Sequence, residues 1–162
     1  KLAEIYSETE QFNLSNNILA DVLEEDSGNL NALSIRGENY FNSSDYNLAL
    51  VSLKKILEID SEYPGIHLKL GRNYYFSSEV DSAEIELKKS IELEEDEHVS
   101  VAHNYLGRIY FDKDSLDRAI YHLTESLKFN PDYFSSKFIL SIIYTNRGID
   151  QFIDERYAEA LN

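Results

Sequence analysis

The sequence predicts an all-α protein built from tandem pairs of helices. Apolar residues make up 43% of the 162 residues, which is enough for a buried core. Only 6 glycines and 2 prolines are available for turns, fewer than a many-stranded β protein needs. The strongest observation is a repeat. Tyrosines recur at intervals of 34, 34, 36 and 34 residues, at Tyr6, Tyr40, Tyr74, Tyr110 and Tyr144.

Small residues recur in phase with these tyrosines. Three positions before each tyrosine stand Ala3, Gly37, Gly71, Gly107 and Ser141. Nine positions after each tyrosine stand Ser15, Ala49, Ala83, Ala119 and Ile153, of which all but the last are small. Two helices joined by a short turn approach closely only where one of them lacks a bulky side chain. These two sets of recurring small residues therefore predict the places where paired helices cross.

Residues 100–133 show one helix pair most clearly. The first half carries apolar residues at the three- and four-residue spacing of one helix face, at Val101, Tyr105, Leu106, Ile109 and Tyr110. Polar residues 112–115 predict a turn, after which the same spacing resumes at Leu116, Ala119, Ile120, Leu123 and Leu127. Pro131 excludes helical geometry at Asn130, so the second helix is predicted to end there.

These residues resemble the tetratricopeptide repeat family, whose 34-residue unit is a helix–turn–helix. Leu106, Gly107, Tyr110, Ala119, Leu123, Leu127 and Pro131 fall on positions of the family pattern. The resemblance implies a right-handed α-solenoid of about five repeats forming one array over residues 1–162. The predicted repeats are a truncated one at 1–29, then 30–63, 64–99 with a two-residue insertion, 100–133 and 134–162.

Some positions depart from the family pattern. The favoured tryptophan is replaced by Leu33, His67, His103 and Lys137. His67 and His103 occupy the same position of their repeats and are interpreted as packing substitutes. Ile153 stands where a small residue is usual, so the last helix pair is expected to be splayed or repacked. The chain begins without methionine and ends without the polar capping helix of a finished array. We therefore expect a fragment of a longer protein.

Composition and charge exclude several classes of function. The 30 acidic and 15 basic residues give a net charge of -15, which disfavours nucleic acid and anionic membranes as partners. No cysteine is present, and no apolar run is long enough for membrane insertion. The four histidines form no zinc motif, and no phosphate loop or nucleophile elbow is found. We expect no enzyme activity, no cofactor and no bound metal in a soluble protein, with the cytoplasm favoured as its compartment.

The family resemblance implies a concave groove lined by the first helices of the repeats. Carried over position by position, the predicted groove residues are Glu38, Phe41, Leu68, Arg72, Tyr75, Phe76, Asn104, Arg108 and Phe111. Arginine forks suit carboxylates, and asparagine can clamp a backbone amide. An acidic group of a partner is therefore expected to face Arg72 and Arg108. The alternative is that the aromatic residues simply pack.

The function predicted from these positions is a non-catalytic scaffold that binds a peptide segment or a helix of a protein partner. Ser34 and Glu38 stand where the family's chaperone-tail clamp needs lysine and asparagine, so an EEVD-type tail is not the expected ligand. One alternative is a self-associating assembly platform, suggested by the unpartnered Phe152, Ile153, Tyr157 and Leu161. Another is a regulatory arm of a larger enzyme.

Overall fold

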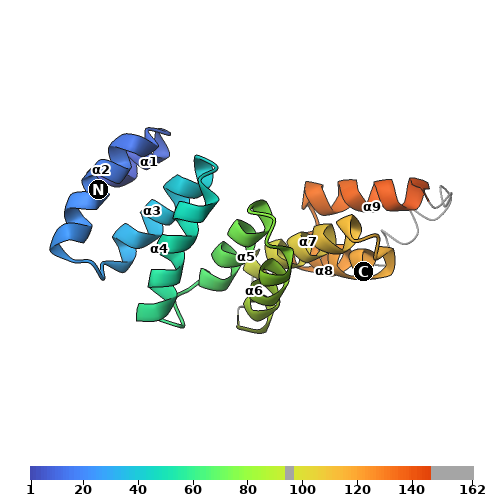
Figure 1. The fold of residues 1–162 in the computed structure, drawn as a ribbon. Helices are drawn as coiled ribbons and strands as arrows, with labels where there is room; N and C mark the ends of the chain where they lie inside the picture. The colour runs from blue at the N-terminus through green and yellow to red at the C-terminus, as the bar shows by residue number, and fades with distance from the viewer. Residues whose placement is uncertain (94–96, 147–162) are drawn as a thin grey trace. The chain divides into compact units, whose positions relative to one another are not determined.

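A computed structural model describes residues 1–93 and 97–146, and all of its regular elements there are α-helices (Figure 1). The helices are α1 (Leu2–Glu8), α2 (Phe12–Glu25), α3 (Leu30–Asn42), α4 (Tyr46–Ile59), α5 (Ile66–Phe76), α6 (Val80–Leu93), α7 (Glu97–Asp112), α8 (Leu116–Phe129) and α9 (Phe134–Asn146). The prediction of an all-α fold of helix pairs is confirmed over these ranges. None of the helices in them is both long and apolar enough to cross a membrane.

The recurring tyrosines mark the ends of first helices. The turns after α1, α3, α5 and α7 each place one non-glycine residue at positive φ, namely Glu10, Ser44, Ser78 and Asp114. The backbone N–H of the residue that follows then donates to the carbonyl of the recurring tyrosine, at 2.8 Å in all four turns. This is the bonding pattern of a left-handed helix cap, which satisfies carbonyls that the helix end leaves open.

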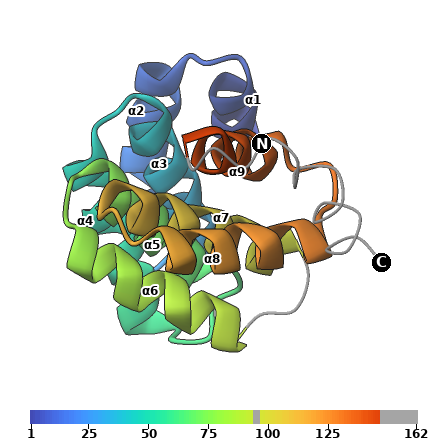
Figure 2. The same cartoon turned by 90° about the vertical axis from the view of Figure 1, so that its right-hand side faces the viewer.

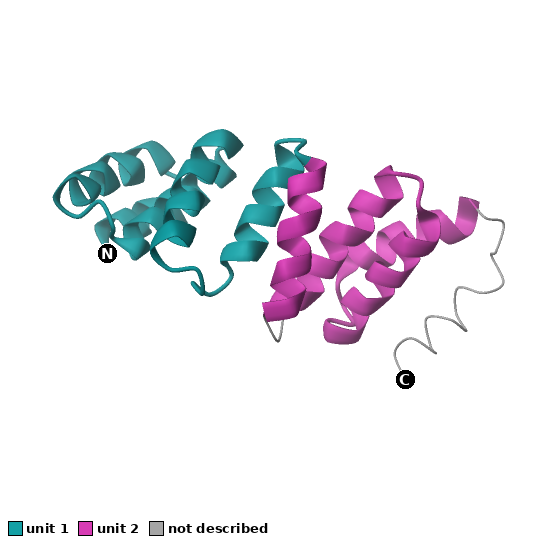
Figure 3. Ribbon diagram, turned by 60° about the horizontal axis from the view of Figure 1, so that its bottom comes forward, with its two compact units in different colours: residues 1–79 teal, residues 80–162 magenta. Residues whose placement is uncertain are grey.

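The chain divides into two compact units, residues 1–79 and residues 80–162 (Figure 3). In unit 1, α1 packs on α2, α3 on α2 and α4, and α4 on α5. In unit 2, α7 packs on α6, α8 and α9, and it lies beside α8 in both views of Figures 1 and 2. The division into five repeats of one array remains a prediction. The predicted features at Phe152, Ile153, Tyr157 and Leu161 lie outside the described residues.

The core of each unit is built from the apolar stripes of its helices. In unit 1 the fully buried side chains include Leu33, Leu53, Ile56, Ile66 and Leu70. In unit 2 they include Leu87, Leu106, Ile109, Leu123 and Leu127. Burying each of these side chains contributes roughly 1.5–3 kcal/mol to the free energy of folding.

The small residue before the recurring tyrosine allows close helix approach in both units. A Cβ atom on Gly107 would lie 2.6 Å from Cγ of Leu123 and 3.3 Å from its backbone nitrogen. A Cβ atom on Gly37 would lie 3.1 Å from Cδ2 of Leu53. In each pair the leucine stands four residues after the small residue of the second helix, so one turn of that helix fits over the glycine.

Glu84 of α6 ties its helix to α7. Its carboxylate accepts hydrogen bonds from Lys88 Nζ at 2.7 Å, from the Tyr110 hydroxyl at 2.6 Å and from Lys113 Nζ at 3.2 Å. The bonds from Lys88 and Tyr110 favour the ionised form and hold the pKa of Glu84 at about 2, against an ordinary 4.5. Glu84 therefore stays charged wherever the protein is near neutral pH.

Glu84→Gln is expected to lower the free energy of unfolding at neutral pH by about 1–2 kcal/mol, because hydrogen bonds to a charged group are lost. The folded-state pKa lies below the ordinary value, so the contribution is present above pH 4.5 and lost as the pH falls toward 2. Urea denaturation followed by circular dichroism at several pH values measures both effects. Asp81→Asn is the matched control, since its carboxylate is 98% exposed. Equal losses in the two variants would contradict the assignment.

Candidate functional site

Five side chains of α3 and α5 form one cluster in unit 1. We call Glu38, Phe41, Lys69, Arg72 and Phe76 the cationic–aromatic cluster. The members on each helix stand three or four residues apart, so each set lies on one helix face. The cluster unites four of the residues predicted from the sequence with one, Lys69, that was not predicted.

Charges in the cluster are arranged around one carboxylate. Oε1 of Glu38 lies 3.1 Å from Nζ of Lys69, and its Oε2 lies 3.5 Å from Nη2 of Arg72. Nζ of Lys69 also donates to the hydroxyl of Ser34 at 3.0 Å. Two cations share one anion, so the cluster carries a net charge of about +1 within a chain of net charge -15. The lysine and arginine side chains are 24% exposed, so their charges are felt at the surface.

The Arg72 guanidinium is held flat by an aromatic ring. Its Cζ lies 4.2 Å from the centroid of the Phe41 ring, which is a close cation–π contact. Phe41 in turn meets the edge of Phe76 at 5.5 Å, and Tyr46 stacks on Phe76 at 5.4 Å. The ring of Tyr75 stands edge-on to Phe76 at 5.3 Å. These rings restrict the rotamers of Arg72, which lowers the entropy that it loses on binding a ligand.

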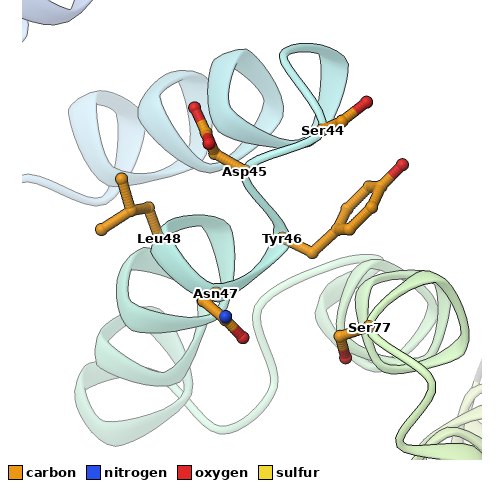
Figure 4. A pocket seen from close by; sticks show the side chains of 6 residues that line it. All are labelled: Ser44, Asp45, Tyr46, Asn47, Leu48 and Ser77. Atoms are coloured by element: carbon orange, nitrogen blue, oxygen red, sulfur yellow. The ribbon is translucent and has the colours of Figure 1, made fainter.

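A surface hollow of about 390 Å³ adjoins these rings at the turn between α3 and α4 (Figure 4). It is lined by Ser44, Asp45, Tyr46, Asn47, Leu48 and Ser77. Figure 4 shows Ser77 approaching from the end of α5, whereas the other five side chains come from the turn and the start of α4. Tyr46 belongs both to the hollow and to the ring stack, so the aromatic surface continues into a polar recess.

Two predicted groove residues are buried. Leu68 is 5% exposed and Asn104 is 1% exposed. The Asn104 amide donates to the hydroxyls of Ser135 at 3.2 Å and Ser136 at 2.9 Å. The Asn104 amide is thus engaged by α9 in this structure, and its clamp on a partner's backbone stays a prediction.

Arg108 and Phe111 lie on α7 in unit 2. The guanidinium of Arg108 lies 5.5 Å from the ring centroid of Tyr105, and Phe111 is half-buried. Arg72 belongs to unit 1, so the predicted joint action of the two arginines stays a prediction. What unit 1 itself assembles is a different pair of cations, Lys69 and Arg72.

Sequence reasoning missed Lys69 and Tyr46. Lys69 could have been found, because it stands three residues before Arg72 on the same helix face. No sequence signal marked Tyr46, which starts a second helix and reaches the cluster only through the fold. Over residues 1–93 and 97–146, no group of three or more histidine, aspartate or glutamate side chains is arranged to hold a metal ion.

The comparisons with known proteins concern the fold. No protein-family model and no curated protein matches the sequence. Among solved structures, a crystal structure of MamA is 21% identical, with 99% of this chain and 93% of that chain covered and a TM-score of 0.84. A second crystal structure of MamA protein is also 21% identical, with coverage of 98% and 86% and a TM-score of 0.81.

A third solved structure carries the family name. YrrB, a TPR protein with an unusual peptide-binding site, is 19% identical, with 98% of this chain and 81% of that chain covered and a TM-score of 0.73. Structural matches at identities this low establish a common fold, but they do not show that the proteins share ligands. The resemblance found in the sequence is thus confirmed at the level of architecture, and the chain has the tetratricopeptide-repeat fold.

Proposed function

We propose that this chain is a non-catalytic interaction scaffold, which binds an extended peptide or a helix of a protein partner at the cationic–aromatic cluster. The observation that carries the proposal is the pair of cations, Lys69 and Arg72, that shares the single carboxylate of Glu38 beside the rings of Phe41 and Phe76. YrrB, a TPR protein with a peptide-binding site, supports the use of this fold for such binding.

Arg72 is the central contact of the proposed site. A guanidinium has five N–H donors, and Glu38 engages it at 3.5 Å, which is a long hydrogen bond. A carboxylate of the partner would complete the neutralisation of the two cations and accept a shorter, charge-assisted bond. The stack on Phe41 keeps the guanidinium oriented while the carboxylate arrives. An acidic side chain or chain terminus is therefore the polar anchor that we expect.

The apolar anchor would sit on the rings beside Arg72. Phe76 is 37% exposed and forms the centre of the stack with Phe41 and Tyr46. Aromatic and arginine side chains carry most of the energy in many protein interfaces. The expected ligand thus has an acidic group next to an aliphatic or aromatic one, with micromolar affinity. Arg108 and Phe111 on α7 extend the proposal to unit 2.

Selection of random peptides on phage against the wild-type chain tests this function. We expect the selected peptides to be enriched in aspartate or glutamate next to an apolar residue. Fluorescence anisotropy should then show that Arg72→Glu weakens the best peptide by about tenfold or more, and that Arg72→Glu with Arg108→Glu weakens it further. Arg72→Lys should lose part of the affinity, because lysine keeps the charge without the flat stack on Phe41.

Lys54→Glu is the matched control for these variants. It makes the same change of charge in unit 1, but Lys54 lies over the ring of Tyr74, at 5.4 Å, outside the cluster. Circular dichroism must show that each variant stays helical. Equal loss of affinity in Arg72→Glu and Lys54→Glu would mean that the effect comes from net charge alone. Full affinity in Arg72→Glu would mean that the peptide binds elsewhere.

A further inference from the structure

Two histidines of unit 2 form a direct hydrogen bond. Nδ1 of His103 on α7 lies 2.9 Å from Nδ1 of His122 on α8. One ring must donate its Nδ1–H and the other must accept through a lone pair, so the two rings hold complementary tautomers. His103 is 6% exposed, and the bond joins helices that pack on each other along their length.

Aromatic rings flank the histidine pair. The ring of His122 stacks on Tyr110 with centroids 5.3 Å apart, and the ring of His103 lies parallel to Phe129 at 6.4 Å. Tyr121 meets the edges of both imidazoles, at 5.0 Å and 6.4 Å. These rings displace part of the water that would otherwise solvate an imidazolium, so adding charge to the pair costs free energy.

The charged groups around the pair are already engaged with one another. The titratable and charged groups facing it are Glu84 and Lys88 of α6, Tyr110 of α7, and Glu125 and Lys128 of α8. Glu84 is bonded to Lys88, Tyr110 and Lys113, and Glu125 to Lys128 at 2.6 Å. Arg118 lies over the ring of Tyr110 at 5.5 Å. On α9 the charged side chain is Lys137, which pairs with Asp132. The carboxylates of Glu84 and Glu125 are therefore already paired with groups other than an imidazolium.

The pair accepts one proton and rejects a second. The first proton adds to Nε2 of the donating ring and leaves the Nδ1–H···Nδ1 bond in place. The second proton must add to the accepting Nδ1, which destroys the lone pair that held the bond. Two N–H groups and two positive charges would then face each other across 2.9 Å, an arrangement that only separation of the rings relieves.

We propose that His103 and His122 form a proton-sensitive latch between α7 and α8, which contributes less stability to unit 2 as the surroundings become acidic and opens when both rings are protonated. The same helices carry Arg108 and the Asn104 contacts to α9, so opening the latch disturbs the part of unit 2 nearest to them. The latch itself lies in unit 2, outside the cationic–aromatic cluster of unit 1.

The pKa values of the two rings set the window in which the latch works. Burial lowers the pKa of His103, and burial together with the neighbouring His103 lowers the pKa of His122 to about 4, from an ordinary 6.5. A folded-state pKa below the ordinary one means that stability is fully present above pH 6.5 and is lost as the pH falls toward 4. Glu84, with a pKa of about 2, stays ionised throughout this window.

The test compares the full chain and two variants at about pH 7 and about pH 5. His122→Gln keeps a hydrogen-bonding group without a titration, and His122→Phe keeps the ring stacked on Tyr110. The urea midpoint of the wild type, followed by circular dichroism, should fall between the two pH values. The midpoints of both variants should fall by less than half as much. His98→Gln is the matched control, because it removes a histidine of α7 outside the latch and should behave like the wild type.

Two further measurements keep the test decisive. Hydrogen exchange read by mass spectrometry, corrected for the slower intrinsic amide exchange at acidic pH, should show lower protection in residues 100–129 of the wild type at about pH 5 than at about pH 7, and this decrease should be smaller in His122→Gln. NMR titration of the histidine ring protons should show separate steps for His103 and His122, both below the ordinary range. The proposal is overturned if wild type and variants lose the same stability on acidification, or if both rings titrate in one step near pH 6.5.

Discussion

Gly107→Ala is expected to destabilise unit 2 by roughly 2–3 kcal/mol, although alanine is the better helix former by about 1 kcal/mol. The new Cβ atom would lie 2.6 Å and 2.7 Å from two atoms of Leu123 and 3.3 Å from its backbone nitrogen. The side chain of Leu123 is fully buried, and the backbone nitrogen cannot swing aside as a side chain does. Either α7 and α8 must move apart or Leu123 must leave its rotamer.

Gly37→Ala is the matched control for this prediction. Its new Cβ atom would lie 3.1 Å from Cδ2 of Leu53 and no closer than 3.4 Å to any other atom, so a shift of a few tenths of an ångström relieves the contact. We expect its stability to stay within about 1 kcal/mol of the wild type, with helix propensity offsetting the contact. Urea denaturation monitored by circular dichroism measures both variants.

The double variant Gly107→Ala with Leu123→Ala separates overpacking from other causes. Shortening Leu123 removes the atoms that the new methyl group strikes, so the two substitutions together should cost less than the sum of their separate effects. Additive losses would mean that Leu123 is not the obstacle. A Gly107→Ala variant as stable as the wild type would show that α7 and α8 can accommodate a Cβ atom at position 107 without loss of packing.

The fold was predictable because its signals are local and repeated. The amphipathic spacing and the recurring small residues, such as Gly37 and Gly107, specify where helices pair. The recurring tyrosines give the length of the repeat. The conformation of the turns was harder to predict. Ser44 and Asp114 adopt positive φ at positions where a glycine would have indicated a left-handed cap. There the hydrogen bond to the tyrosine carbonyl offsets the cost of the unusual conformation.

The candidate site was predictable only in part, because its geometry depends on partners far away in the sequence. Arg72 and Phe41 could be assigned from their repeat positions, but the sharing of Glu38 with Lys69 requires α3 and α5 to be placed side by side. The burial of Asn104 could not be predicted for the same reason. Its repeat position predicts a surface amide, whereas serines 31 and 32 residues later on α9 bury it.

Asn39→Leu is expected to cost roughly 3 kcal/mol of the free energy of unfolding of unit 1, because it removes three hydrogen bonds of a fully buried amide. Nδ2 of Asn39 donates to Ser15 Oγ and to Asn16 Oδ1, both at 2.8 Å, and its Oδ1 accepts from Ser7 Oγ. The amide thereby connects α3 to α1 and to α2. Leucine has the same branched side-chain skeleton as asparagine, so the substitution leaves no empty cavity.

Ser15→Ala decides between the two explanations of such a loss. If the lost hydrogen bonds cause the cost, Ser15→Ala should cost less in the Asn39→Leu background than in the wild type, because its bond to Asn39 is already gone. If steric misfit of leucine causes it, the losses of the two single variants should add, since Ser15 donates to the carbonyl of Ala3 at 2.8 Å in both backgrounds. Urea midpoints of the four proteins measure this coupling.

The outcome also bears on the proposed binding site. Glu38 precedes Asn39 on α3, so the buried amide fixes the rotation of the helix that carries the shared carboxylate to Lys69 and Arg72. A variant that folds but lets α3 rotate should weaken peptide binding as well as stability, although residue 39 touches no ligand. Ser15→Ala, which leaves Asn39 bonded to Ser7 and Asn16, should keep full affinity. Unchanged affinity in a folded Asn39→Leu variant would mean that core packing alone orients α3.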